Sequence, residues 1–252
     1  MADREERLDH AQRWLNDAFR VIDPPGGFTT LEVDMTRALA LVEKLRAGGV
    51  RATYNHLVAR ATAVVLARRP ELNQMVAGIR RLHPERVDIG LSVAGSTNFA
   101  PVMVLEDAGH KPLRALAEEI VRRVPEVKAK AEKDLAGMRR WGWLIPFGPL
   151  RRLILRWLYT RLWFRRRLAG TFQVSCSGLT DINVPFLFNT AAVLGAGRVR
   201  DRVVAVDGQP AVRPILTISV CIDHKAWDGV RAYRFLDQVR RVLEDDTLEG
   251  EA

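Results

Sequence analysis

The segment ISVCIDHKAWDG, residues 218–229, joins a strand-like pattern to side chains that can carry chemistry. Alternation predicts a strand with Ile218, Val220, Ile222 and His224 on one face. The Asp-Gly pair at 228–229 then predicts the start of a helix. His224 at such a strand end is either a core histidine or a rigidly held general base. Cys221 falls on the opposite face, which argues against a Cys-His nucleophile pair.

The composition is that of a folded globular chain. The 252 residues are 48% hydrophobic and 27% charged, which excludes disorder. No uncharged apolar run reaches the roughly 18 residues of a spanning helix, and the charged beginning of the chain does not resemble a secretory signal. The two cysteines form no Cys-x-x-Cys pair, which excludes a disulfide framework and a cysteine-built zinc site. We therefore expect a cytoplasmic protein without a metal site.

Periodicity predicts an α+β fold in a single domain, since no long linker or repeat interrupts the chain. We expect a hairpin turn at Asp207-Gly208. Helices are expected at residues 4–21, 36–47, 54–67, 112–124 and 229–244. Strands are expected at residues 28–33, 86–94, 101–105, 171–175, 191–195, 199–206 and 212–222.

Residues 223–229, Asp-His-Lys-Ala-Trp-Asp-Gly, resemble the Asp-His-Arg-x-x-Asp-Gly signature of the dihydrolipoyl acyltransferase core of 2-oxoacid dehydrogenase complexes. The chloramphenicol acetyltransferase fold carries a related His-x-x-x-Asp-Gly. Segments 31–36, 53–73, 87–94, 170–175 and 193–199 resemble the family in the same order, so the similarity covers roughly residues 28–124 and 170–245. The resemblance implies a chloramphenicol acetyltransferase-like mixed β-sheet with layered helices, within one catalytic domain over residues 1–252.

The resemblance also implies acyl transfer between coenzyme A and another thiol or acceptor, by a homotrimer whose active sites lie between subunits. It favours His224 as the general base that deprotonates the attacking thiol. Ser175 matches the serine of the family's Gly-Thr-Phe-Thr-Ile-Ser run, and it is either the oxyanion donor or an ordinary strand serine. Asp228 matches the family's acidic position, where its expected role is to hold the histidine loop.

Several positions depart from the family pattern. Neither a lipoyl domain nor a subunit-binding domain is recognisable before the core, so we expect no covalent lipoyl group on this chain and a separate lipoyl or carrier protein as partner. Cys176 stands where the family usually has asparagine or serine. Trp227 replaces a smaller aliphatic residue, which predicts a reshaped pocket beside the base. These differences leave the acceptor open.

The net charge of +9 comes from one segment. Between Leu135 and Thr180 there are nine arginines, no lysine and no acidic residue, and the rest of the chain holds 30 basic and 30 acidic residues. This local excess does not indicate a nucleic-acid-binding fold. Compared with the family, residues 135–169 form a basic, tryptophan-rich helical insert.

A helix over residues 150–167 would separate apolar side chains from arginines. This pattern suits a helix lying in an anionic membrane interface through residues 139–167, which would make the protein a peripheral membrane protein. The apolar stripe could equally pack on the core or a neighbouring subunit, and an acidic protein or a nucleotide is a third candidate partner. The alternative function is therefore a non-catalytic interaction protein that docks through the insert. The expected membrane contacts are Trp141, Trp143, Trp157, Trp163, Arg165, Arg166 and Arg167.

Overall fold

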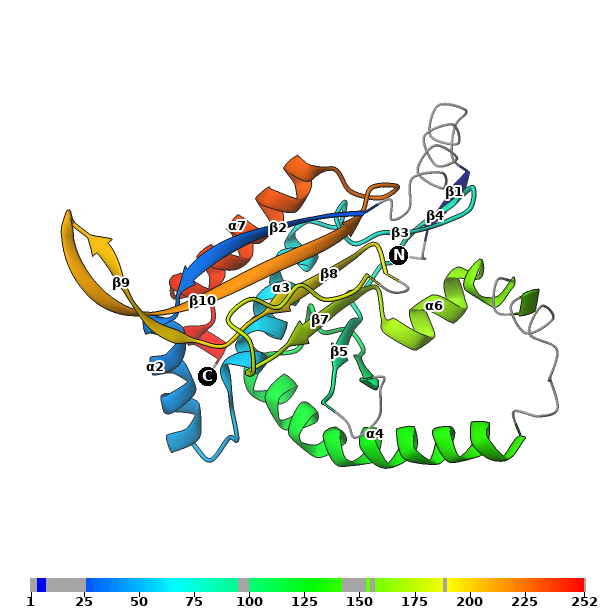
Figure 1. The fold of residues 1–252 in the computed structure, drawn as a ribbon, viewed down its shortest axis with the longest axis horizontal. Helices are drawn as coiled ribbons and strands as arrows, with labels where there is room; N and C mark the ends of the chain where they lie inside the picture. Colours follow the sequence, from blue (N-terminus) through cyan, green and yellow to red (C-terminus); the bar gives the residue numbers. More distant parts are fainter. Residues whose placement is uncertain are drawn as a thin grey trace.

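A computed structural model describes residues 4–7, 26–94, 100–141, 153–154, 157–187 and 190–251, except for the side chains of residues 4, 135 and 137–141. A seven-stranded mixed sheet forms the centre of the molecule (Figure 1). Its strands run in the spatial order β2-β10-β8-β7-β5-β6, and β9 pairs with β10. The β5, β7 and β8 strands are parallel to one another, whereas the remaining pairings are antiparallel. The strands are β2 (Gly26–Asp34), β5 (Ile89–Ser92), β6 (Val102–Leu105), β7 (Phe172–Cys176), β8 (Ala192–Ala196), β9 (Arg200–Val206) and β10 (Gln209–Asp223).

The long strand β10 connects two parts of the fold. Its first half pairs with β9, and the resulting hairpin projects from the body of the protein (Figure 1). Its second half pairs with β2 on one side and β8 on the other, and nearly every residue of that half is buried. Asp207 and Gly208 both have positive φ angles, 51° and 77°, which confirms the expected tight hairpin turn.

Helices cover the sheet. The α3 helix (Tyr54–Arg68) packs against β5, β7, β8 and α7 (Gly229–Glu244), and α7 packs against β2 and β10. All residues from His56 to Leu66 are buried, because α3 lies between the sheet and other helices. The α2 helix (Thr36–Ala47) contacts α3 and α7, while α4 (Leu113–Trp141) contacts α3 and β6. The 3₁₀ helix η2 (Glu249–Glu251) ends the described chain. This arrangement confirms an α+β fold with helices layered on a mixed sheet.

The helix expected over residues 4–21 is wrong at its start. Residues Arg4–Arg7 form strand β1, which pairs with β4 (Arg80–His83) and, through it, with β3 (Met75–Ala77) in a second, three-stranded sheet. Opposite charges meet across the pair, since Glu5 lies 3.2 Å from Arg80 and Glu6 lies 3.8 Å from Arg81. Residues 8–25 lie outside the described residues.

Two other helical predictions need correction. The helix expected to end at Val124 continues as α4 to Trp141, through Pro125. Pro125 is exposed, so water can satisfy the carbonyl that loses its helical donor there. The continuous helix expected over residues 150–167 is interrupted at Thr160 and Arg161, and α6 (Leu162–Ala169) begins only after this break.

Candidate active site

His224 follows directly on the last residue of β10 and begins a tight turn. The backbone N–H of Asp223 donates to the carbonyl of Ala191 at 2.8 Å, which fixes the strand end against the residue before β8. The carbonyl of Asp223 then accepts hydrogen bonds from the N–H groups of Ala226 and Trp227, at 2.8 and 3.0 Å. The backbone on both sides of His224 is therefore held by hydrogen bonds, as a positioned base requires.

Trp227 anchors this turn in the core. Its indole is 1% exposed, packs on Phe172 and Phe235, and donates from Nε1 to the carbonyl of Leu72 at 3.2 Å. The sequence suggested that Trp227 reshapes the pocket beside the base. The indole is buried in the core and therefore does not line an open pocket beside the base. A buried aromatic ring with a satisfied N–H instead fixes the turn that carries His224.

His224 itself is exposed, and its ring lies over the neighbouring strand β2. A β-carbon built on Gly27 would stand 3.3 Å from Nε2 and 3.8 Å from Cδ2 of His224. Gly27 pairs with Ile222 in the sheet, two residues before the histidine. The absence of a side chain at position 27 thus leaves the room in which the imidazole lies.

The Asp223 carboxylate, which is buried, interacts with two cations. It accepts a hydrogen bond from the backbone N–H of Lys225 at 3.0 Å and lies 3.4 Å from Lys225 Nζ. Lys225 occupies the arginine position of the family signature. Arg165 of α6 supplies a guanidinium nearby: burial lowers its pKa, and the Asp223 charge opposes that shift. Arg165 also donates to the carbonyl of Val76 at 2.7 Å. The insert therefore reaches the turn that carries His224.

Asp228 lies at the start of the helix that follows the histidine turn. Its carboxylate accepts from the backbone N–H of Arg231 at 2.8 Å, which caps the N-terminus of α7. Its side chain is exposed and lies 3.6 Å from the Arg231 guanidinium. These contacts end the histidine turn and begin the helix.

Ser175 lies on β7, and Asn183, which the sequence analysis missed, fixes its backbone. Asn183 Nδ2 donates to the Ser175 carbonyl at 2.8 Å and lies 3.5 Å from its hydroxyl. The Ser219 hydroxyl donates to the Asn183 carbonyl at 2.6 Å. Between these residues lies Gly195, where a β-carbon would stand 2.1 Å from the Asn183 carbonyl oxygen. No periodic signal marks Asn183, because it lies in an irregular segment between two strands.

The two cysteines are poor nucleophiles. Burial raises the pKa of the Cys176 thiol to about 12, and burial also raises the pKa of Cys221. Both side chains therefore remain protonated near neutral pH. Among the described residues, no cluster of histidine, cysteine or carboxylate side chains has a metal-binding arrangement.

The fold separates Ser175 from His224 within one chain. Ser175 pairs with Gly195 of β8, and Gly195 pairs with Ser219 of β10, five residues before His224. Five residues along a strand correspond to about 17 Å, and two strand spacings add about 9.5 Å across the sheet. One chain therefore places His224 and Asp228 at the same turn but leaves Ser175 distant from His224.

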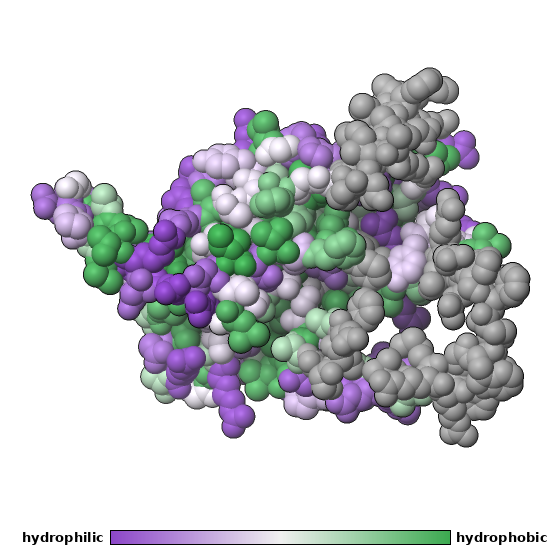
Figure 2. All heavy atoms as spheres, in the orientation of Figure 1, coloured by the Kyte–Doolittle hydropathy of each residue, from purple (hydrophilic) through white to green (hydrophobic). Residues whose placement is uncertain are grey.

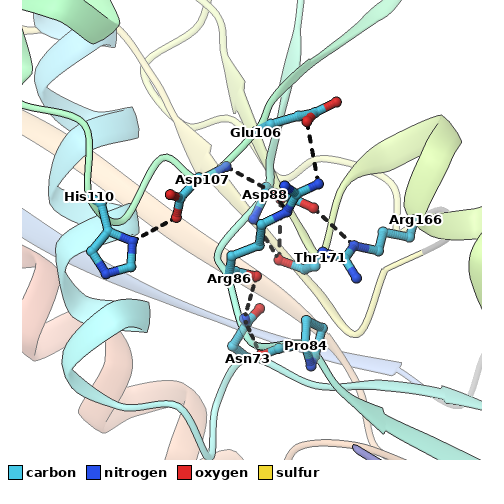
Figure 3. A network of polar contacts seen from close by, with 9 residues as sticks. All are labelled: Asn73, Pro84, Arg86, Asp88, Glu106, Asp107, His110, Arg166 and Thr171. Carbon is cyan, nitrogen blue, oxygen red and sulfur yellow. Dashed lines mark hydrogen bonds and ion pairs between the residues drawn. The ribbon is translucent and has the colours of Figure 1, made fainter. Parts of the chain in front are cut away.

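The insert contributes both buried and exposed side chains. Contrary to the expectation of membrane contact, Arg165 and Arg166 turn into the protein, and Arg166 Nε lies 2.9 Å from the buried Asp88 carboxylate (Figure 3). Leu162 packs against Met75 and Leu82 of the small sheet. Trp157, Trp163 and Arg167 are exposed, whereas Trp143 and the side chain of Trp141 lie outside the described residues. No described helix has the length and apolar character needed to cross a bilayer.

Comparison with known proteins agrees with this architecture. The profile of the 2-oxoacid dehydrogenases acyltransferase (catalytic domain) family matches residues 24–137 and 170–249, and leaves out most of the insert. The lipoamide acyltransferase component of the branched-chain alpha-keto acid dehydrogenase complex of Bacillus subtilis (strain 168) is 25% identical over 87% of this chain and 47% of its own length. The chain thus spans about half the length of the curated relatives it matches.

Solved structures confirm the fold class. The cubic core of the pyruvate dehydrogenase multienzyme complex superposes with a TM-score of 0.69, at 21% identity, over 95% of this chain and 87% of that chain. A chloramphenicol acetyltransferase superposes with a TM-score of 0.56, at 16% identity, over 95% of this chain and 100% of that chain. The chloramphenicol acetyltransferase-like fold expected from the signature at residues 223–229 is therefore confirmed.

Proposed function

Because the chain belongs to the family of 2-oxoacid dehydrogenase acyltransferase catalytic domains, we propose that it transfers an acyl group between coenzyme A and a second thiol or other acceptor. The observation that carries this proposal is the position of His224, which is exposed on a turn fixed by Asp223, Trp227 and the cap at Asp228. A rigid turn with an exposed imidazole is what a general base needs.

The imidazole acts on the attacking thiol. A neutral His224 ring accepts the thiol proton, and the resulting thiolate attacks the thioester carbonyl. The carbon–sulfur bond to coenzyme A then breaks, and the leaving thiolate takes the proton back from the imidazolium. The high pKa values of Cys176 and Cys221 argue against a covalent cysteine intermediate, so the acyl group passes directly between the two substrates.

The oxyanion donor comes from a second subunit in this proposal. The Ser175 hydroxyl is too far from His224 of its own chain to act on the same carbonyl, but it can face the His224 turn of a neighbour in a homotrimer. Apolar side chains at 178–187 support such an interface, since Leu179 and Phe186 are 87% and 84% exposed. Figure 2 shows hydrophobic side chains gathered over the middle of the face that it draws.

The acceptor class in this proposal is taken from the family. A separate lipoyl-bearing or other carrier protein supplies the second thiol, and coenzyme A is a substrate that leaves after each cycle. To test this, the purified chain is mixed with acetyl-CoA or longer acyl-CoA, with and without dihydrolipoamide, and free coenzyme A is followed chromatographically. We expect acceptor-dependent release of coenzyme A that His224→Ala lowers by about 10²–10⁴-fold. Equal release by a folded His224→Ala variant would reject His224 as the base.

The alternative is a non-catalytic protein that docks through the insert. The exposed side chains of Leu153, Trp157 and Trp163, at 64%, 54% and 60%, favour a contact there with a membrane or a protein. In that case no acyl-CoA is consumed with any acceptor, while flotation with anionic vesicles or capture by a partner is lost on Trp157→Ala. The coenzyme A assay therefore separates the two functions.

A further inference from the structure

A groove of about 720 Å³ lies beside the beginning of α6, apart from the His224 turn and Ser175. Its walls come from residues 157–167 on one side and from β1, β4, the segment just before β5, and β6 with the residue after it on the other. We call it the α6 groove. Its volume is in the range of small-molecule sites. Residues 157–167 lie outside the two segments that the family profile matches, so the groove belongs to this chain's insert.

Positive charge exceeds negative charge in the α6 groove. Its three carboxylates are all paired: Glu5 with Arg80 at 3.2 Å, Asp88 with Arg166 at 2.9 Å, and Glu106 with Arg86 at 3.3 Å. Figure 3 shows Arg86, from the segment just before β5, and Arg166, from α6, close to the Asp88 carboxylate. Two further guanidinium groups, from Arg161 and Arg167, also line the groove.

Arg161 and Arg167 are available for an anion. Neither has a carboxylate partner among the residues that the structure describes, and the Nε of Arg161 is buried without a hydrogen-bond acceptor there. A buried donor without an acceptor is costly, so a ligand oxygen would stabilise it. The Arg161 guanidinium lies 4.6 Å from the ring centroid of Trp157, which fixes its place at the groove wall.

The N-terminus of α6 adds to the positive electrostatic potential of the α6 groove. Thr160, Arg161, Leu162 and Trp163 all line the groove, so α6 begins at its wall. Arg161 provides no side-chain cap, and the first turn of α6 has no acidic residue. Its first N–H groups and the positive end of the helix dipole therefore favour a negatively charged ligand.

The rest of the lining is apolar and aromatic. Leu82, Val104 and Leu162 contribute aliphatic surface, and the indoles of Trp157 and Trp163 are both more than half exposed. Such a lining fits a ligand that combines a charged group with a flat or apolar part. Guanidinium groups suit phosphate oxygens in particular, because their donors match phosphate geometry.

We propose that the α6 groove binds a phosphate-bearing ligand that has an aromatic or apolar moiety, with Arg161, Arg167 and the N-terminus of α6 on the phosphate. A soluble nucleotide and a phospholipid headgroup share this chemistry. The groove binds its ligand independently of acyl transfer, since His224 does not line it.

Calorimetric titration of the full chain with ADP and with inorganic phosphate tests the proposal. A second test is flotation of the chain with phosphatidylcholine vesicles that contain or lack phosphatidylserine. The double variant Arg161→Gln/Arg167→Gln should weaken binding at least about tenfold, since it removes two charge-assisted contacts. The control Arg51→Gln/Arg122→Gln removes the same charge from positions outside the groove and should bind as wild type. Thermal melting verifies that each variant is folded.

Saturable ADP binding that only the groove variant loses identifies a soluble ligand. Flotation that requires phosphatidylserine and is lost in the same variant, without ADP binding, identifies a lipid headgroup. Absence of both, or an equal loss in the control variant, overturns the proposal. His224→Ala should leave this binding unchanged. The binding experiment therefore tests the ligand of the α6 groove separately from the proposed acyl transfer.

Discussion

Gly27 lies against the imidazole of His224, so that a β-carbon at position 27 would stand 3.3 Å from Nε2. This spacing is slightly tighter than ordinary van der Waals contact, and the ring would have to move by a few tenths of an ångström to relieve it. Two neighbouring strands, β2 and β10, thus set the position of the proposed base through a missing side chain.

Gly27→Ala should lower kcat for acyl transfer by about tenfold, because small displacements of a positioned base are costly. The strand should keep its stability, since alanine is compatible with an extended backbone. Steady-state kinetics and thermal melting measure the two effects. Gly229→Ala is the matched control, because a β-carbon there meets nothing within 4 Å. An unchanged kcat in Gly27→Ala would show that the imidazole position is not critical.

Ser175→Ala should lower acyl transfer by about 10²–10³-fold if the hydroxyl stabilises the oxyanion. When His224→Ala and Ser175→Ala chains are unfolded, mixed in equal amounts and refolded together, some activity should return. A site that joins an intact histidine with a neighbour's intact serine arises in about a quarter of random pairings. Separately refolded variants serve as the control. If mixing restores nothing while both variants form trimers, the two groups do not share a site between subunits.

Cys176 should resist alkylation. With a pKa of about 12, its thiolate is scarce at pH 8, and its fraction increases roughly tenfold with each pH unit below the pKa. Iodoacetamide labelling followed by mass spectrometry of the Cys176 peptide, with an unfolded sample as control, measures this protection. Fast labelling of the folded protein at pH 8 would contradict this prediction and would make Cys176 a candidate nucleophile again.

Arg166→Gln should destabilise the fold by about 1–3 kcal/mol, because it removes a charged partner from the buried Asp88 carboxylate. Arg167 is exposed, and Arg167→Gln should change stability by less than about 0.5 kcal/mol. Urea unfolding of the two variants compares neighbouring arginines of the same helix. Equal stability would mean that Arg166 does not hold α6 to the body.

The segment at residues 248–251 should not join trimers into a cage. The buried Arg60 guanidinium holds Glu251 at 2.6 and 2.7 Å, and Leu248 is 2% exposed in the core of its own chain. Moving this segment onto a neighbouring trimer would leave Arg60 without its carboxylate. We expect native mass spectrometry to show three chains. A cubic particle would mean that another surface connects trimers.

Local patterns in the sequence determined much of the region around His224. Alternation along β10 and the capping aspartate at 228 act within a few residues, so the last strand, the turn and α7 were predicted nearly to their ends. The bounds of α2 were also correct, because apolar spacing and the following glycines are local signals. The motif at 223–229 indicated the family through seven consecutive residues, which is a local signal as well.

Other features of the structure depend on long-range packing, which local sequence patterns do not reveal. Residues 4–7 became a strand because their charges meet those of β4, and Arg165 and Arg166 turned inward because Val76 and Asp88 lie beneath α6. The separation of Ser175 from His224 follows from strand order, and the contact of Asn183 with Ser175 depends on a loop folding back. Except for the Asn183 contact, each of these joins residues far apart in sequence, and the energies of all of them depend on the completed fold. The sequence by itself therefore determined most elements of the central sheet and its covering helices and the candidate base, whereas the tertiary structure decided which side chains meet.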